Sequence, residues 1–488
     1  MNAAADIVTL TLVSHTNAGK TTLARTLLRR DVGEVRDAPH VTQENAPFDL
    51  LRTDDGAVLR LWDTPGFGDS VRLAERLARS GNPIGWLLSN VWDRLVDRNF
   101  WFSQQILRNV RDEADVVLYL VNATEDPAHM GYIAPEMQIL TWVGKPVLVL
   151  LNQLGPPRDR RLEDADVMLW RETFAATPIV RGVMSLDAFA RCWVQEDALL
   201  AQIEPILDAG KQGVFAKLRQ AWSVRNRRIF ADAMGVLAAQ IARAAQAKAS
   251  VERGSFLDSI TRMAARVGRP RTEGERRPEA AAIEVLARAL AEDIRRTTDA
   301  LLQLHGLDGA ATPAILQRLA TQVDATRSID ENQATVIGGA VVGALSGLIA
   351  DIAAGGLTFG GAALSGAVAG AVGARFAARG INRVRGTNST MLAWNDAFLL
   401  DLTRTALLRY LAVAHFGRGR GEWIESEFPS HWRPMVEAVV GEKLESLSKA
   451  IDAARATGDA HRITDWLDER CREALERLYP GARQGPAD

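Results

Sequence analysis

The chain has 488 residues, of which 47% are hydrophobic, and this length is enough for two to four domains. The 58 Lys and Arg residues against 60 Asp and Glu residues give a net charge of −2, which excludes a chain-wide basic field, so we expect no nucleic-acid partner. The two cysteines, Cys192 and Cys471, exclude a disulfide framework and a cysteine-based zinc site, and they are typical of a reducing cytosol.

The first predicted elements are a strand over residues 7–13 and a helix over residues 22–30, joined by a short loop. This setting is typical of a P-loop, in which backbone N–H groups surround a phosphate chain. Lys20 would then contact the β and γ oxygens, and the Thr21 hydroxyl would bind Mg²⁺. Ser14 departs from the P-loop pattern at its first glycine, and the alternative is a helix N-terminus with one exposed lysine. The loop reads Ser14-His15-Thr16-Asn17-Ala18-Gly19-Lys20-Thr21.

Two further strands are predicted over residues 48–52 and 57–62, and the second runs directly into Asp63-Thr64-Pro65-Gly66. Such a sequence alone is compatible with an ordinary turn, because Pro and Gly both favour turns. After a P-loop it indicates the loop that senses hydrolysis, with Asp63 in the magnesium shell and the Gly66 amide donating to the γ-phosphate.

Three more strands are predicted over residues 115–121, 146–151 and 178–184, and the first two are continuously apolar, as strands covered on both faces should be. Strands that alternate with helices predict an α/β P-loop NTPase head over residues 1–207. Its sheet should be mostly parallel and doubly wound, with the ligand at the carboxyl ends of the strands.

Beyond residue 207 the strand signal disappears and helical spacing dominates. We therefore expect an all-α half, made of a helical region over 208–333, a glycine-rich hairpin over 334–380 and a C-terminal helical region over 381–488. The helical patterns in this half are residues 212–250, 283–301, 391–416, 430–456 and 460–478.

Small residues recur every four positions in the hairpin segment, which lets two helices approach closely, as in membrane helix pairs. An arm such as residues 336–350 would rise about 22 Å, which is short of a hydrocarbon core of ~30 Å. Two interpretations stay open: a glycine-zipper hairpin that contacts a membrane, and a soluble, tightly packed hairpin. The recurring residues are Gly339, Gly343, Gly347, Ala362, Gly366, Gly370 and Ala374.

These motifs resemble the translation-factor class of P-loop GTPases, of the Era, septin and tRNA-modification type, over roughly residues 1–190. The run from Asp63 to Asp69 is similar to the septin version of its loop. The whole architecture resembles a group of bacterial GTP-binding proteins whose C-terminal helical domain contains a glycine-rich hairpin and has no assigned function.

The resemblance implies the roles of the site residues. Lys20, Thr42 and Gly66 would act in GTP hydrolysis, and Thr21, Thr42 and Asp63 would bind Mg²⁺. Thr42 falls where the family keeps its switch I threonine, and the alternative is a loop hydroxyl without a ligand. The residues expected to contact the nucleotide are Ser14, Asn17, Ala18, Gly19, Lys20, Thr21, Thr22, Asn152 and Ser185.

Two positions bear on catalysis. Phe67 stands where Ras-like enzymes keep a water-orienting glutamine, so water would have to be positioned in another way. Asn17 matches an asparagine that, in tRNA-modification GTPases, helps to hold a monovalent cation beside the β- and γ-phosphates. K⁺-stimulated hydrolysis is therefore a hypothesis, and the alternative is that Asn17 only shapes the loop.

The base-reading motif departs most from the family. After strand 146–151 the family has Asn-Lys-x-Asp, and this chain has Asn152-Gln153-Leu154-Gly155. Gly155 offers no acceptor to guanine, and the loss of such a partner costs ~1.5–3 kcal/mol, so preference for GTP over ATP is open. Ser185 matches the last guanine-contacting loop loosely, and Asp187 either supplies the missing carboxylate or caps a helix.

The aromatic-rich segment 84–106 favours self-association or a protein partner, or else packing against the chain's own helices. The sequence thus predicts a GTP-binding protein that hydrolyses GTP to GDP slowly with Mg²⁺, as a switch coupled to a helical half. The alternative is a nucleotide-binding scaffold, or a membrane-assembly protein, with little hydrolysis. The N-terminus lacks the features of a signal peptide, so we expect a cytoplasmic protein, with peripheral or integral contact to the inner membrane if the hairpin enters lipid.

Overall fold

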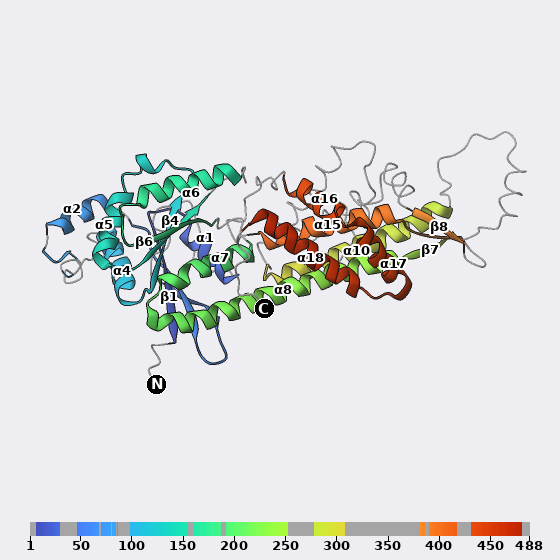
Figure 1. Cartoon of the computed structure of the whole chain (residues 1–488), viewed down its shortest axis with the longest axis horizontal. Helices are drawn as coiled ribbons and strands as arrows, with labels where there is room; N and C mark the ends of the chain where they lie inside the picture. Colours follow the sequence, from blue (N-terminus) through green and yellow to red (C-terminus); the bar gives the residue numbers. More distant parts are fainter. Residues whose placement is uncertain are drawn as a thin grey trace, which may run out of the picture. The chain divides into compact units, whose positions relative to one another are not determined.

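The computed structural model shows a chain that divides into two compact units (Figure 1). The first unit comprises Met1–Arg228, Ala414–Trp423 and Tyr479–Asp488, and the second comprises Ile229–Val413 and Ile424–Leu478. The residues that the structure describes are 6–29, 46–67, 70–79, 81–83, 85, 98–153, 160–186, 192–251, 278–307, 381–385, 390–416 and 431–480.

A six-stranded sheet forms the centre of the first unit, in the order β2-β3-β1-β4-β5-β6. All neighbouring strands are parallel except the edge pair of β2 and β3. The predicted doubly wound sheet is therefore confirmed, and its six predicted strands are all present. Their bounds are β1 (Ile7–Ser14), β2 (Ala46–Arg52), β3 (Val58–Asp63), β4 (Val116–Asn122), β5 (Val147–Asn152) and β6 (Val180–Ser185).

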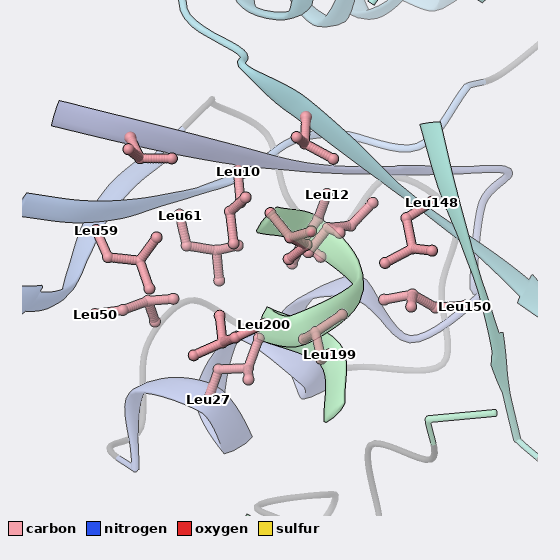
Figure 2. Packing of buried hydrophobic residues seen from close by; sticks show 14 of the residues in the cluster. Leu10, Leu12, Leu27, Leu50, Leu59, Leu61, Leu148, Leu150, Leu199 and Leu200 are labelled. Carbon is pink, nitrogen blue, oxygen red and sulfur yellow. The ribbon is translucent and has the colours of Figure 1, made fainter. Parts of the chain in front are cut away.

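Helices cover both faces of this sheet, because its central strands carry apolar side chains on both sides. One face packs against α1 (Lys20–Leu28), α7 (Trp193–Ile203) and the first turns of α8 (Ala209–Gln246). Figure 2 shows leucines of β1, β3 and β5 beside Leu27 of α1 and Leu199 and Leu200 of α7. The other face packs against α2 (Ser70–Ala78), α4 (Arg98–Asp112), α5 (Ile133–Val143) and α6 (Arg160–Phe174).

The strand order reverses beside β1, because β3 lies on one side of it and β4 on the other. In open α/β sheets, ligands bind at such a reversal, outside the carboxyl ends of the strands. Ser14, Asp63 and Asn152 are the last residues of β1, β3 and β5, and they therefore lie along this edge. The sequence-predicted phosphate, metal and base elements share one rim of the sheet.

The second unit is rich in helices that bury apolar residues against one another. Leu237, Ile294, Leu301, Leu399 and Leu467 are each at most 1% exposed. A three-stranded antiparallel sheet, in the order β7-β9-β8, accompanies the helices. The elements are the later turns of α8, then β7 (Lys248–Val251), α10 (Pro278–Leu304), β8 (Ile381–Arg385), β9 (Thr390–Trp394), α15 (Asp396–Ala414), α16 (Trp432–Gly441), α17 (Leu444–Thr457) and α18 (His461–Leu478).

The small sheet corrects the expectation that the second half has no strands. Each strand is only four or five residues long and lacks an extended apolar run, so no period-2 signal stands out. The helical pattern predicted over residues 391–416 divides into the end of β9 and α15. The glycine-rich segment 334–380 lies outside the described residues. Among the helices that the structure describes, none has both the length and the apolar character to cross a membrane.

Candidate functional site

The loop between β1 and α1 has the backbone of a phosphate cradle. Asn17 and Gly19 take left-handed conformations, with φ of 65° and 89°. A Cβ on Gly19 would lie 2.4 Å from Nδ2 of Asn152, so glycine is required for both its φ and its close approach. N–H groups arranged in such a loop form a concave anion site, and the N-terminus of α1 adds its positive dipole.

Lys20 is buried in this cradle, and among the described residues its hydrogen bonds go to neutral oxygens of the loop. Its Nζ donates to Oγ of Ser14 at 2.7 Å and to the carbonyl oxygen of His15 at 3.4 Å. Burial lowers the pKa of Lys20 to about 8, against the opposing effect of the charges of Asp63 and Glu136. Ser14, the departure from the P-loop pattern, thus serves as a hydrogen-bond partner of Lys20.

Thr21 and Asp63 form the candidate magnesium site. The Thr21 hydroxyl donates to Oδ2 of Asp63 at 2.6 Å, and burial raises the pKa of Asp63 to about 6. Oδ1 of Asp63 is buried and has no hydrogen-bond partner among the described residues. Mg²⁺ prefers such oxygens, so the unpartnered carboxylate oxygen fits a bound cation. Thr42, the third predicted ligand, lies outside the described residues.

The loop after Asp63 packs closely on the P-loop. Thr64 donates through Oγ1 to the carbonyl oxygen of Leu12 at 2.6 Å, and the Phe67 N–H donates to the carbonyl oxygen of Ser14 at 2.9 Å. A Cβ on Gly66 would lie 2.9 Å from Cα of Thr16, so a side chain there would push the two loops apart. The Phe67 side chain is fully buried in the core, where it cannot contact a reacting water.

The residues at the base end of the site turn toward the P-loop backbone. Nδ2 of Asn152 donates to the carbonyl oxygen of Ala18 at 2.8 Å, and Nε2 of Gln153 donates to that of Asn17 at 3.2 Å. Oγ of Ser185, at the end of β6, is buried and has no partner in the described part of the chain. Gly155 and Asp187 lie outside that part.

The structure thus brings most of the predicted site residues to one edge of the sheet. The part of segment 84–106 that belongs to a described helix, residues 98–106, lies in α4. Thr22 is buried within the first turn of α1. The predicted residues that meet at the edge are Ser14, Asn17, Ala18, Gly19, Lys20, Thr21, Asp63, Gly66 and Asn152.

Sequence reasoning missed a buried carboxylate beside the P-loop. Nδ1 of His15 lies 2.9 Å from Oε1 of Glu136, and the hydroxyl of Tyr119 donates to Oε2 of Glu136 at 2.6 Å. Glu136 is fully buried. The signal that was available is a carboxylate within the mostly apolar helix α5, because a buried charge needs partners.

A second buried carboxylate, Glu196 of α7, was also missed, and it lies near the carboxyl end of α1. It accepts from Nε1 of Trp222 at 2.8 Å and from Nδ2 of Asn226 at 3.2 Å, both on α8. Arg29, which follows α1, donates to Oδ1 of Asn226 at 2.6 Å and lies 3.6 Å from Glu196. This network joins α1, α7 and α8 within the first unit.

Two family models match the chain. The model described as a 50S ribosome-binding GTPase matches residues 9–153, and the model described as a domain of unknown function (DUF3482) matches residues 179–479. No curated protein matches the chain.

Among solved structures, the chain is similar to Era in complex with MgGDPNP and nucleotides 1506–1542 of 16S ribosomal RNA, with 18% identity and a TM-score of 0.30. That match covers 42% of this chain and 57% of the Era chain, so it spans less than two thirds of Era. A probable GTP-binding protein EngB has 16% identity, a TM-score of 0.27, and coverage of 41% of this chain and 98% of its own. Toc33 from Arabidopsis thaliana, in complex with GDP and Mg²⁺, has 16% identity and a TM-score of 0.24. That match covers 38% of this chain and 73% of the Toc33 chain.

Proposed function

The chain belongs to the family described as a domain of unknown function (DUF3482) and begins with a P-loop GTPase domain, and on this basis we propose that it is a GTP-hydrolysing, Mg²⁺-dependent switch. In this switch the helical half responds to the bound nucleotide. The observation that carries the proposal is the meeting of Lys20, Thr21 and Asp63 at one buried point. Two elements, α1 and β3, supply a cation, a hydroxyl and a carboxylate where a triphosphate would dock.

Each residue has a distinct role in this proposal. The cradle of backbone N–H groups and Lys20 binds the β- and γ-phosphates, and Gly66 offers its N–H to the γ-phosphate. Thr21 and Asp63 hold Mg²⁺, which when bound neutralises charge on the β- and γ-phosphates. Because Phe67 is fully buried, its side chain takes no part in orienting water, and slow hydrolysis is expected.

Single-turnover hydrolysis of GTP by the full chain tests the proposal. The wild-type protein should bind GTP and convert it to GDP, and Lys20→Ala should lower both affinity and rate, by about 100-fold or more. A matched control is Lys217→Ala, which removes an exposed lysine that pairs with Asp55 on the surface. Full binding and turnover by the Lys20→Ala protein would contradict the proposal. If the wild-type protein binds GTP and leaves it intact over hours, the alternative of a non-hydrolysing scaffold, which the buried Phe67 favours, replaces it.

Coupling to the helical half rests on the network around Glu196. This network holds the end of α1, whose first turn carries Lys20 and Thr21, against α8. Residues 209–228 of α8 belong to the first unit, and residues 229–246 belong to the second. A change at α1 on nucleotide binding would therefore act on a helix that the two units share.

Hydrogen exchange measures this coupling. Peptides of α8 and α10 should exchange differently in the GDP-bound and GTP-analogue-bound full chain, and Asn226→Ala should reduce the difference while nucleotide binding persists. Lys217→Ala, on the exposed face of α8, should leave the difference unchanged. An unaltered difference in the Asn226→Ala protein would contradict the route through Glu196.

Membrane contact through residues 334–380 is a separate part of the proposal, and the recurring small residues of that segment support it. Flotation with liposomes should recover the full chain and lose a variant that lacks these residues. Equal recovery of the two proteins, or recovery of neither, would contradict membrane contact and favour the packed hairpin.

A further inference from the structure

A fully buried carboxylate connects the P-loop to helix α5. Glu136 accepts the Tyr119 hydroxyl on Oε2 at 2.6 Å, and its Oε1 lies 2.9 Å from Nδ1 of His15. His15 is the second residue of the P-loop, and Glu136 is 121 positions away in the sequence. Tyr119 is also fully buried.

The orientation of the His15 ring is fixed from two directions. A carboxylate only accepts hydrogen bonds, so the short contact assigns the proton to Nδ1 of His15, which donates to Glu136. The ring of Tyr132 stacks on the imidazole, with centroids 4.2 Å apart and planes inclined by 14°. Burial, and then the charge of Glu136, raise the pKa of Tyr119, so its hydroxyl stays protonated and keeps the carboxylate in place.

The main chain at Ser14 and His15 is where the other parts of the site meet. The carbonyl oxygen of His15 accepts from Nζ of Lys20 at 3.4 Å. His15 also forms a parallel bridge with Phe67, whose N–H donates to the carbonyl oxygen of Ser14. Lys20 and the loop of Gly66 and Phe67 are therefore both positioned by the main chain of Ser14 and His15. The His15 side chain, through Glu136, holds this part of the main chain to α5.

We propose that His15 is a positioning residue of the nucleotide site. Through Glu136 it anchors the start of the P-loop to α5, and it thereby holds Lys20 and the loop of Gly66 and Phe67 where the γ-phosphate requires them. The imidazole acts through these groups and does not touch the reacting atoms. This inference rests on the proposed nucleotide binding and identifies a residue that the P-loop pattern does not contain.

The test compares three variants of the full chain. His15→Ala removes the anchor, and single-turnover hydrolysis should slow by about 10- to 100-fold, because small misplacements of reacting groups have effects of this size. The affinity for GDP should change by less than about 3-fold, while the preference for a γ-phosphate-containing analogue over GDP should fall. His15→Asn keeps an N–H donor near the place of Nδ1, and it should restore most of the rate and of the preference.

The matched control is Thr11→Val. Thr11 lies in β1 and donates to Oδ1 of Asn109 on α4 at 2.9 Å, so this nearly isosteric change also removes a buried hydrogen bond that ties β1 to a helix. It should lower the melting temperature without changing the rate or the preference by more than about 2-fold. A general loss of stability would affect both proteins alike.

The outcomes separate this inference from the proposed function. Equal effects of His15→Ala and Thr11→Val, or no rescue by His15→Asn, would overturn the positioning role. If the wild-type protein binds GTP without hydrolysing it, the proposed turnover fails, and the γ-phosphate preference alone decides the role of His15. If it binds no nucleotide, both proposals fall.

Discussion

The phosphate end and the base end of the candidate site differ in how they use the same scaffold. At the phosphate end, Lys20, Thr21 and Asp63 converge from different elements onto one buried point. At the base end, Asn152 and Gln153 direct their amides to the P-loop backbone, and the Ser185 hydroxyl has no partner within the described residues. The first end keeps the residue types of the P-loop pattern except at Ser14, whereas the second keeps Asn152 of the base-reading motif and departs from that motif at Gln153 and Gly155.

The difference shows that phosphate binding depends mainly on the backbone, whereas base selection depends on a side chain. Phosphate binding uses backbone N–H groups and a helix N-terminus, which the fold itself supplies once Gly19 allows the turn. Base selection uses a side-chain carboxylate on a loop, and position 155 of this chain has none. A chain can therefore keep the triphosphate site while its choice of base changes.

The largest effect should come from Asp63→Asn, at the phosphate end. An amide of the same shape cannot offer two anionic oxygens, so the Mg²⁺ concentration needed for hydrolysis should rise and the rate should fall by about 100-fold. The measurement is a Mg²⁺ titration of single-turnover hydrolysis. Asp49→Asn, which removes an exposed carboxylate of β2, is the matched control and should behave as wild type. Identical Mg²⁺ dependence of the Asp63→Asn and wild-type proteins would remove the metal site.

Gly155→Asp should restore base selectivity. A carboxylate that accepts from guanine adds ~1.5–3 kcal/mol, so the ratio of GTP to ATP affinity should rise by about 10- to 100-fold from a low wild-type value. Competition of the two nucleotides for the full chain measures this ratio. Gly155→Asn, which adds a similar side chain without the charge, should raise it less. A wild-type ratio already above about 1000 would show that another residue reads the base.

A smaller effect on the rate of hydrolysis is expected at Asn17, the P-loop residue whose carbonyl oxygen accepts from Gln153 of the base end. The Asn17 side chain is exposed, and the described residues provide no hydrogen-bond partner for it, so it is available to a cation beside the phosphates. Hydrolysis in KCl should exceed that in NaCl by several-fold, because added positive charge favours the transition state. Asn17→Ala should remove the difference. Equal wild-type rates in the two salts would leave Asn17 as a residue that only shapes the loop.

The smallest effect concerns Asp197 of α7, the helix that follows the base-end segment. Burial, and then the charge of Glu196, raise the pKa of Asp197 to about 7. The folded state therefore binds a proton that the unfolded state releases near pH 4, and this contribution to stability is lost as the pH rises from about 4 to 7. Asp197→Asn should raise the melting temperature by a few degrees at pH 8 and have little effect at pH 4.

The exposed Asp55 is the control for this pH dependence, because hydrogen bonds from Thr53 and then Lys217 lower its pKa to about 2. Asp55→Asn should change stability slightly and in the opposite direction. If the Asp197→Asn protein has the same melting temperature as the wild-type protein at every pH, the Asp197 carboxyl group is solvated and the prediction is wrong.

The parts of the molecule that could be predicted from the sequence are those whose residues are contiguous along the chain. The P-loop and the Asp-Thr-Pro-Gly loop each follow an apolar strand directly, so a local pattern predicted both the fold and the place of the candidate metal ligands Thr21 and Asp63. The partnership of His15 with Glu136 could not be predicted, because it depends on which helix the doubly wound sheet places beside the P-loop. The strands β7, β8 and β9 were missed for a related reason, since pairing between distant segments stabilises them more than their own composition does.

The close approach of Gly66 to Thr16 has a practical consequence. A methyl group at position 66 would clash with the backbone of Thr16. The loop of Gly66 and Phe67 would then stay displaced, while the phosphate cradle remains free to bind nucleotide. In the proposed switch, Gly66→Ala would then arrest the protein before the conformation that the γ-phosphate stabilises. Binding partners that distinguish the two conformations could be isolated by comparing what the arrested and native proteins retain.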